Sequence, residues 1–178
     1  MEKLTVEADE NLQKIIKTEV TNGELNIYTS ARISHASATK IYVKMKSINS
    51  LEASSGANAE TTSGIDLSSF KVSVSSGAEI KLALSSKDLQ TESSSGGSIS
   101  LSGKTSKLAV ESSSGSDINA EKLNSEVCSV DASSGSRVKV SVSKRIEAHA
   151  SSGSDIYVNG NPSERDIEKS SGGSVSFK

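Results

Sequence analysis

Hydrophobic and polar residues alternate along most of this chain, and the alternating pattern recurs about every 19 residues. A self-similar period near 20 residues is typical of a solenoid, in which each repeat stacks on the next. A Ser-Ser-Gly triplet aligns the repeats, at spacings of 18 to 21 residues. The triplets end at Gly56, Gly77, Gly96, Gly115, Gly135, Gly153 and Gly172.

Apolar residues occupy fixed positions on both sides of these glycines. Three residues after the glycine stand Ala59, Ile80, Ile99, Ile118, Val138, Ile156 and Val175. Five residues before it stand Leu51, Val72, Thr91, Val110, Val130, Ala148 and Ile167. The residues between are mostly polar, and a period of two predicts strands with one buried face. Each repeat is therefore predicted to run as strand, Ser-Ser-Gly turn, strand and variable corner.

Short strands of nearly equal length can stack in register about 4.8 Å apart. The sequence thus predicts an all-β fold, a right-handed parallel β-helix with coils of about 19 residues, its hand following from the general chirality of protein chains. Glycine supplies the positive φ that a tight turn needs, and we expect the serines stacked beside it to hydrogen-bond along the ladder. We expect one domain over 1–178, with an irregular cap in 1–28 and the repeat body in 29–178.

The N-terminal segment is less regular than the repeats. It predicts a strand, a short polar excursion and then two strands around Asn22-Gly23, a dipeptide that strongly favours a hairpin turn. The segment after it fits the repeat as a degenerate coil, with Ile33, Ile41 and Val43 inward and Ala38 in the place of the glycine.

Composition narrows the class of protein. Hydrophobic residues make up 33% and aromatic residues 3%, which suits a narrow core of aliphatic side chains. The net charge of −2 is spread along the chain without a basic block, so the signature of a nucleic-acid binder is missing. No apolar run is long enough for a transmembrane segment. No signal peptide is evident at the N-terminus, so we expect a chain trimmed of its natural start.

Two stretches of the sequence resemble a known family. The segment "VEADENLQKIIKTEVTNGELNIY", followed by serine-glycine turn repeats, resembles the "putative auto-transporter adhesin, head GIN domain" family of Gram-negative cell envelopes. The resemblance implies a β-helix similar to pectin lyases, a location at the outer surface or in the periplasm, and a role in adhesion. It supplies no catalytic residues.

A column of mostly acidic residues lies four positions before each glycine, where alternation points the side chains outward. Together with Tyr157, which is the one exposed aromatic expected in the regular repeats, it forms the candidate binding face. The column contains Glu52, Glu92, Glu111, Asp131, His149 and Glu168, with Ser73 as an interruption. Three interpretations stay open: a solvated sheet face, a face that binds a ligand or Ca²⁺, and a catalytic pair of carboxylates.

Other residues predict little chemistry. Cys128 falls in the apolar column of Phe70, Leu89, Leu108 and Ile146, so we expect a buried side chain and not a reactive thiol. His35 and His149 are far apart in the sequence and lie in different columns. We expect no cofactor and no catalytic or metal-binding residues.

The predicted function is that of a non-enzymatic adhesin or binding scaffold, with a glycan or a surface protein as partner. Two alternatives remain. The first is a polysaccharide lyase or hydrolase, which would need carboxylates converging in a groove. The second is a structural protein that assembles end to end into a homo-oligomer through its open coil ends.

Overall fold

The computed structural model describes residues 2–32 and 39–178. By their contacts these residues form two compact units, one up to Ser47 and one from Ile48 onward.

The N-terminal unit consists of two antiparallel strand pairs and a short helix. Strand β1 (Lys3–Ala8) pairs with β4 (Thr39–Lys44), and β2 (Ile16–Thr21) pairs with β3 (Glu24–Thr29). Helix α1 (Glu10–Gln13) connects β1 to β2. The turn between β2 and β3 is Asn22-Gly23, with φ of 53° and 81°, as the sequence predicts.

Residues 39–44 do not stack as a degenerate coil. Ile41 and Val43 lie in β4, which pairs antiparallel with β1, while Ile33 and Ala38 lie outside the described residues. A period of two is the same for a strand in a hairpin and a strand in a solenoid, so alternation did not reveal the partner of this segment. The stacked coils begin at β5.

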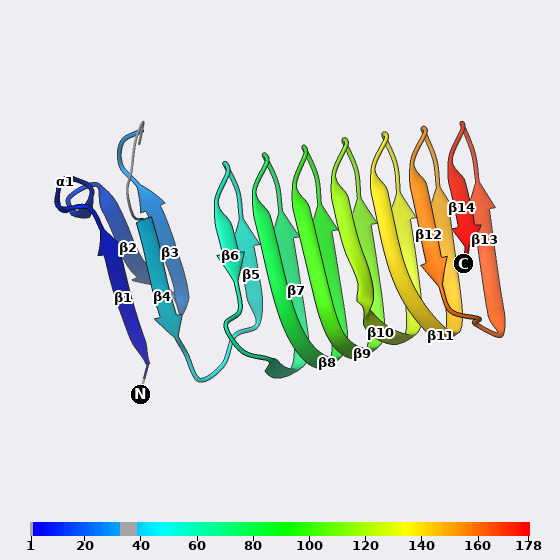
Figure 1. Ribbon diagram of the computed structural model, residues 1–178, viewed down its shortest axis with the longest axis horizontal. Coiled ribbons are helices and arrows are strands. Elements are labelled where there is room, and N and C mark those ends of the chain that lie inside the picture. The colour runs from blue at the N-terminus through cyan, green and yellow to red at the C-terminus, as the bar shows by residue number, and fades with distance from the viewer. Residues whose placement is uncertain (1, 33–38) are drawn as a thin grey trace. The chain divides into compact units, whose positions relative to one another are not determined.

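The second unit is a parallel β-solenoid of about seven turns with coils of about 19 residues. Figure 1 shows the coils side by side along the unit. Its strands are β5 (Ser50–Ala53), β6 (Asn58–Glu60), β7 (Ile65–Val74), β8 (Glu79–Ser93), β9 (Ser98–Ser112), β10 (Asp117–Ala132), β11 (Arg137–Ala150), β12 (Asp155–Asn159), β13 (Glu164–Lys169) and β14 (Ser174–Phe177). Every strand pair in this unit is parallel.

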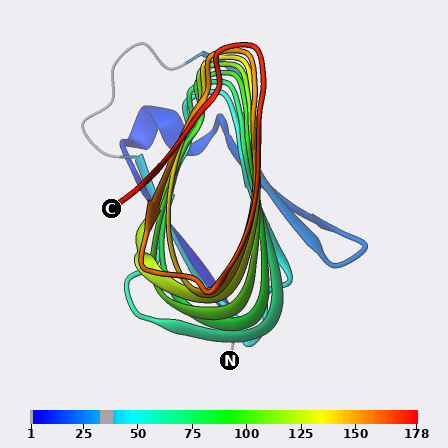
Figure 2. The ribbon, with the colours of Figure 1, turned by 90° about the vertical axis from the view of Figure 1, so that its right-hand side faces the viewer.

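Each coil has two walls. The first wall is the stretch before the Ser-Ser-Gly turn and the second wall is the stretch after it. Viewed down the solenoid axis, the two walls of a coil meet in a narrow turn at one end and in a rounded bend at the other (Figure 2). The long strands β8 to β11 run continuously through this bend, so each supplies the second wall of one coil and the first wall of the next.

The core is a set of ladders of aliphatic side chains between the two walls. Ile80, Ile99, Ile118, Val138 and Ile156 are fully buried and occupy equivalent positions in successive coils. Burial of one such side chain stabilises the fold by about 1.5–3 kcal/mol. The inward columns predicted from alternation are confirmed, and no large aromatic core is needed.

The Ser-Ser-Gly triplets form two-residue turns in which both central residues have positive φ. The second serine has φ of 46–53° and the glycine 69–79°. The amide of the residue after the glycine donates to the carbonyl of the first serine at 2.8–3.2 Å, which completes a type I′ turn. The role of the glycine is as predicted, whereas the positive φ of the serine was not foreseen.

Serine side chains after the glycine bond to the backbone and not mainly to each other. Ser116, Ser136 and Ser154 donate their hydroxyls to carbonyls of the preceding coil at 2.8–2.9 Å. Ser116 Oγ also lies 2.9 Å from Ser112 Oγ. The serines thus bond from coil to coil, but their partners are backbone carbonyl oxygens and not the stacked serine hydroxyls that the sequence predicts.

Candidate functional site

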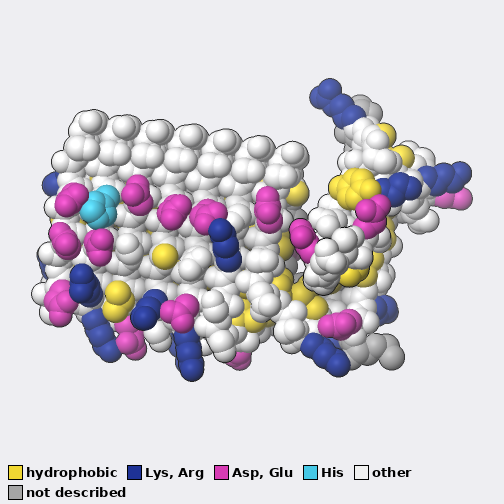
Figure 3. Space-filling view, turned by 180° about the vertical axis from the view of Figure 1, so that it is seen from behind, with side chains coloured by type: hydrophobic (Ala, Val, Ile, Leu, Met, Phe, Trp, Pro, Cys, Tyr) yellow, Lys and Arg dark blue, Asp and Glu magenta, His cyan; other side chains and the backbone are white. Residues whose placement is uncertain are grey.

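The acidic column runs along the outer surface of the first wall, directly beside the turns. Figure 3 shows its carboxylates and the single histidine in one line across the coils. Register pairing places its members next to one another in the order Glu52, Ser73, Glu92, Glu111, Asp131, His149 and Glu168. Adjacent strands lie about 4.8 Å apart, so like charges are close neighbours.

A basic side chain partly neutralises the column at Glu92. Lys71 lies two residues before Ser73 on β7, and its Nζ is 2.6 Å from Glu92 Oε1. Ser73 donates its hydroxyl to the other oxygen of Glu92 at 3.3 Å. The hydrogen bond to Glu92 raises the pKa of Lys71. Such an exposed pair adds little to stability because water screens it, so it orients Glu92 more than it stabilises the fold.

His149 is held between two carboxylates near the end of the column. Its Nδ1 lies 3.0 Å from Glu168 Oε2 and its Nε2 lies 3.4 Å from Glu147 Oε1. The hydrogen bond to Glu147, followed by the charge of Glu168, raises the pKa of His149. A raised pKa favours the imidazolium form, which interrupts the negative row with a positive charge at mildly acidic pH.

The surface beside the column is hollowed where Ser73 replaces a longer side chain. A shallow depression of about 270 Å³ lies there, and Glu52, Glu92 and Glu111 are among the residues that line it. Within residues 2–32 and 39–178, no group of three or more His, Cys, Asp and Glu is arranged to hold a metal ion. The row of carboxylates can accept hydrogen bonds and attract cationic partners along its length.

Tyr157 is on the other wall. It lies in β12, paired with Lys139 of β11 and Ser176 of β14, and its side chain is exposed. The acidic column belongs to the first wall, so the structure brings six of the seven predicted face residues into one row and leaves Tyr157 outside it.

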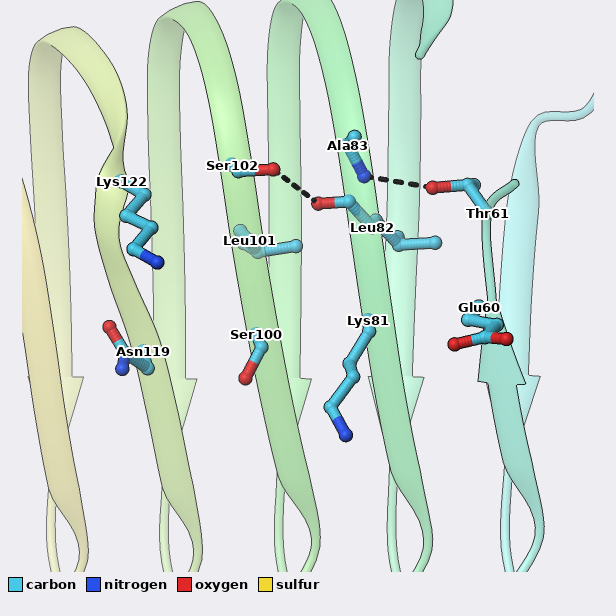
Figure 4. A pocket seen from close by; sticks show the side chains of 10 residues that line it. All are labelled: Glu60, Thr61, Lys81, Leu82, Ala83, Ser100, Leu101, Ser102, Asn119 and Lys122. Atoms are coloured by element: carbon cyan, nitrogen blue, oxygen red, sulfur yellow. Dashed lines mark hydrogen bonds between the residues drawn. The ribbon is translucent and has the colours of Figure 1, made fainter. Parts of the chain in front are cut away.

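A hollow on the second wall was not predicted from the sequence. It has a volume of about 320 Å³, and its lining includes two lysines, an asparagine and several short side chains (Figure 4). The lining residues are Glu60, Thr61, Lys81, Leu82, Ala83, Ser100, Leu101, Ser102, Asn119 and Lys122. We call this depression the second-wall hollow.

Cys128 is buried in the core at 1% exposure, as its column predicts. Burial raises the pKa of its thiol to about 12, so the thiolate is scarcely populated at neutral pH. His35 lies outside the described residues. No described helix has the length and apolarity needed to cross a membrane.

A comparison of the sequence with known protein families agrees with the repeat architecture of this chain. Residues 1–162 match the family model described as "Putative auto-transporter adhesin, head GIN domain". The chain belongs to this family. The resemblance drawn from the N-terminal segment and the turn repeats is thereby confirmed, and it extends over nearly the whole chain.

Solved structures of similar fold come from species of Bacteroides and Parabacteroides. A "putative adhesin" from Bacteroides fragilis has 16% sequence identity and a TM-score of 0.90, covering 100% of this chain and 83% of that one. A "putative lipid binding protein" from Parabacteroides distasonis has 17% identity and a TM-score of 0.77, covering 99% and 84%. A "putative adhesin" from Parabacteroides merdae has 15% identity and a TM-score of 0.71, covering 99% and 83%. At these identities the likeness establishes the fold alone. No curated protein matches the chain in sequence.

Proposed function

We propose that this protein is a non-enzymatic binding module of the cell envelope, which holds glycan or protein partners on the outer walls of its solenoid. The observation that carries the proposal is the in-register outward-facing row of charged side chains from Glu52 to Glu168, which Ser73 interrupts. A repeated row on a hydrogen-bonded wall offers many equivalent weak contacts. The family description, an adhesin head domain, supports both the adhesive role and the envelope location.

The layout of the carboxylates supports binding more than catalysis. Glycoside hydrolysis needs two carboxyl groups on opposite sides of the scissile bond. The carboxylates of the acidic column instead follow one another along a single wall. The Ser-Ser-Gly turns are two residues long, so they form no loops that could build a cleft at that end of the coils.

The test is retention of the purified protein on an array of envelope glycans, host glycans and matrix proteins, in calcium and again with a chelator. We expect selective retention of a few components. Retention of none would overturn the proposal. Loss of retention with the chelator alone would mean that a cation bridges the carboxylates and the partner.

A pair of matched variants tests whether the acidic column is the face that binds. The first combines Glu92→Gln, Glu111→Gln and Asp131→Asn, and we expect it to lose retention of cationic or calcium-bridged components. The control neutralises the same number of charges on the second wall, through the triple change Glu79→Gln, Asp117→Asn and Asp155→Asn. Equal retention by both variants would exclude the column as the binding face.

A second candidate function, contact with a lipid layer, is favoured by the N-terminal unit. Val20, Leu25 and Ile27 share one face of the β2–β3 hairpin, and Val20 is 72% exposed. One similar structure is described as a "putative lipid binding protein". Flotation with phosphatidylethanolamine and phosphatidylglycerol vesicles tests the idea. We expect co-flotation that Val20→Glu abolishes, and failure of the wild type to float would dismiss it.

A further inference from the structure

The second-wall hollow owes its shape to short side chains surrounded by long ones. Ala83, Ser100 and Ser102 are half-buried and form its floor, while Lys81 and Lys122 are exposed at its rim. Lys81 and Ser100 are register partners, and so are Ser102 and Lys122. The two lysines therefore stand on β8 and β10, with the serines of β9 between them (Figure 4).

A β-bulge in β10 determines which side chain stands at this rim. Asn119 pairs with Ser100, and Lys122 pairs with Ser102, so β10 advances three residues where β9 advances two. Without the extra residue, Glu121 would stand opposite Ser102. Bulges characteristically re-aim a side chain, and here the bulge replaces an acid with a base.

The bulge also orients the asparagine beside it. The Oδ1 atom of Asn119 accepts a hydrogen bond from the backbone amide of Glu121 at 3.2 Å. The carbonyl end of the Asn119 side chain is thus occupied, and its NH₂ group remains available as a donor at the hollow.

The two lysines differ in how far their charge is already balanced. Lys81 Nζ lies 2.8 Å from Glu79 Oε1, and Glu60 adds a weaker attraction that also raises the pKa of Lys81. Lys122 forms no ion pair with any residue that the structure describes. It is therefore the stronger anchor for an incoming anion.

We propose that the second-wall hollow binds one acidic sugar residue of a glycan chain, with its anionic group between Lys122 and Lys81 and its hydroxyls toward Asn119 and Ser100. The volume of about 320 Å³ is at the small end of ligand sites and suits a single sugar ring. The lining places the Asn119 amide and the hydroxyls of Ser100 and Ser102 beside the lysines, which matches a ligand that carries hydroxyls as well as a negative charge. Glu60 also lines the hollow, on the far side of Lys81. A bare phosphate would bring only negative charge near Glu60.

An acidic peptide fits this place less well. Peptides that bind sheets usually add a strand at an exposed edge. The strands of the hollow, β8, β9 and β10, are interior strands whose backbones are already paired on both sides. The contacts available there are side-chain contacts on a face.

This inference rests on the proposed function, since it names the ligand class of one of the two walls. The experiment measures affinity for an oligogalacturonate, with a neutral galactan oligosaccharide, a sulfated heparin fragment and oligoglutamate as further probes. We expect oligogalacturonate to bind and galactan not to bind. Equal binding of the heparin fragment would assign the site to sulfate and carboxylate alike, which keeps the acidic-sugar class.

The variants locate the site. Loss of one charge-assisted contact corresponds to about a tenfold or greater loss of affinity. We expect Lys122→Gln to show this loss, Lys81→Gln to show a smaller one, and Ser100→Glu to abolish binding by placing a carboxylate on the floor. The matched control is the double change Lys104→Gln and Lys107→Gln, compared with Lys81→Gln and Lys122→Gln together, because neither control residue lines the hollow.

Each contrary outcome has its own meaning. Equal losses in the two double variants would show an effect of net charge and overturn the inference. Oligoglutamate binding as tightly as oligogalacturonate would overturn the glycan assignment. A wild type that binds other array components but no acidic sugar would overturn this inference and leave the proposed function standing, whereas binding to nothing would overturn both.

Discussion

At the turn end of the solenoid core, the side chain of Val74 fills the volume that a side chain at Gly97 of the next coil would need. A Cβ atom placed on Gly97 would lie 2.9 Å from Val74 Cγ1. The same position carries Ser116, Ser136 and Ser154 in later coils, and there the residue facing it from the preceding coil is Ser93, Ser112 or Ala132. The large residue in one coil is thus accommodated by a glycine in the next.

We predict that Gly97→Ser destabilises the protein and that Val74→Ala reverses part of the loss. Overpacking in a core costs about 1–3 kcal/mol, and residues in contact couple by about 0.5–3 kcal/mol. A serine at position 97 would also give a partner to Ser93 Oγ, the one buried side-chain oxygen among the described residues that has none. Denaturant unfolding of both single variants and the double variant measures the coupling. Additive effects would contradict the steric relationship.

The second serine of each turn offers a way to raise stability. Ser114 has φ of 53° before Gly115 at 69°, and Asn-Gly is the preferred dipeptide of a type I′ turn. We predict that Ser114→Asn stabilises the protein by a few tenths of a kcal/mol. Ser114→Val should destabilise it by about 1–2 kcal/mol, because a β-branched residue resists positive φ. Thermal and denaturant unfolding test the order Asn, Ser, Val, and a reversed order would contradict the turn assignment.

The repeat made most of the solenoid predictable. Equal spacing of the turn glycines fixes which residues stack, and alternation fixes which face inward, so the core ladders and the acidic column follow from the sequence. The spacing from Gly115 to Gly135 is 20 residues, against 19 in each of the two preceding repeats, and this extra residue indicates the bulge in β10. That count shows an extra residue without showing where it lies, so the place of Lys122 at the rim could not be deduced.

Other features depend on contacts that no local pattern reports. The partner of β4 is β1, about forty residues away, and its alternation alone suits a coil equally well. Gly103 and Gly160 at the rounded bend approach the preceding coil so closely that a Cβ would lie 1.9 Å from Leu84 O and 2.3 Å from Val142 O. Such close approaches become visible only when the coils are stacked.

His149 should titrate above its ordinary pKa of about 6.5. Glu147 and Glu168 favour its protonated form, so its contribution to stability is present below pH 6.5 and is lost as the pH rises through the higher folded pKa. We predict that Glu147→Gln lowers the pKa of His149 more than Glu168→Gln, although the Glu168 contact is shorter, because Glu168 is more exposed to solvent. An NMR titration with His149→Asn as the assignment control measures this. A pKa unchanged by both variants would contradict the arrangement.

Cys128 should be inert in the folded protein and should weaken it only at high pH. Burial raises the pKa of the Cys128 thiol to about 12. At pH values where this thiol is ionised in the unfolded chain but not in the folded protein, the free energy of unfolding therefore falls as the pH rises. Between the ordinary pKa of a thiol and pH 12 we expect this residue to cost about 1.4 kcal/mol of stability per pH unit.

Cys128→Val removes the thiol while keeping a small apolar side chain in the core column, so it isolates this effect from the titration of lysines and tyrosines. We expect the two proteins to have similar stability at pH 7 and the variant to lose less stability between pH 9 and pH 11. A thiol-specific disulfide reagent at pH 8 should label the wild type only after denaturant is added. Rapid labelling of the native protein, or parallel stability curves for the two proteins, would place the Cys128 side chain in contact with water and contradict its position between the walls.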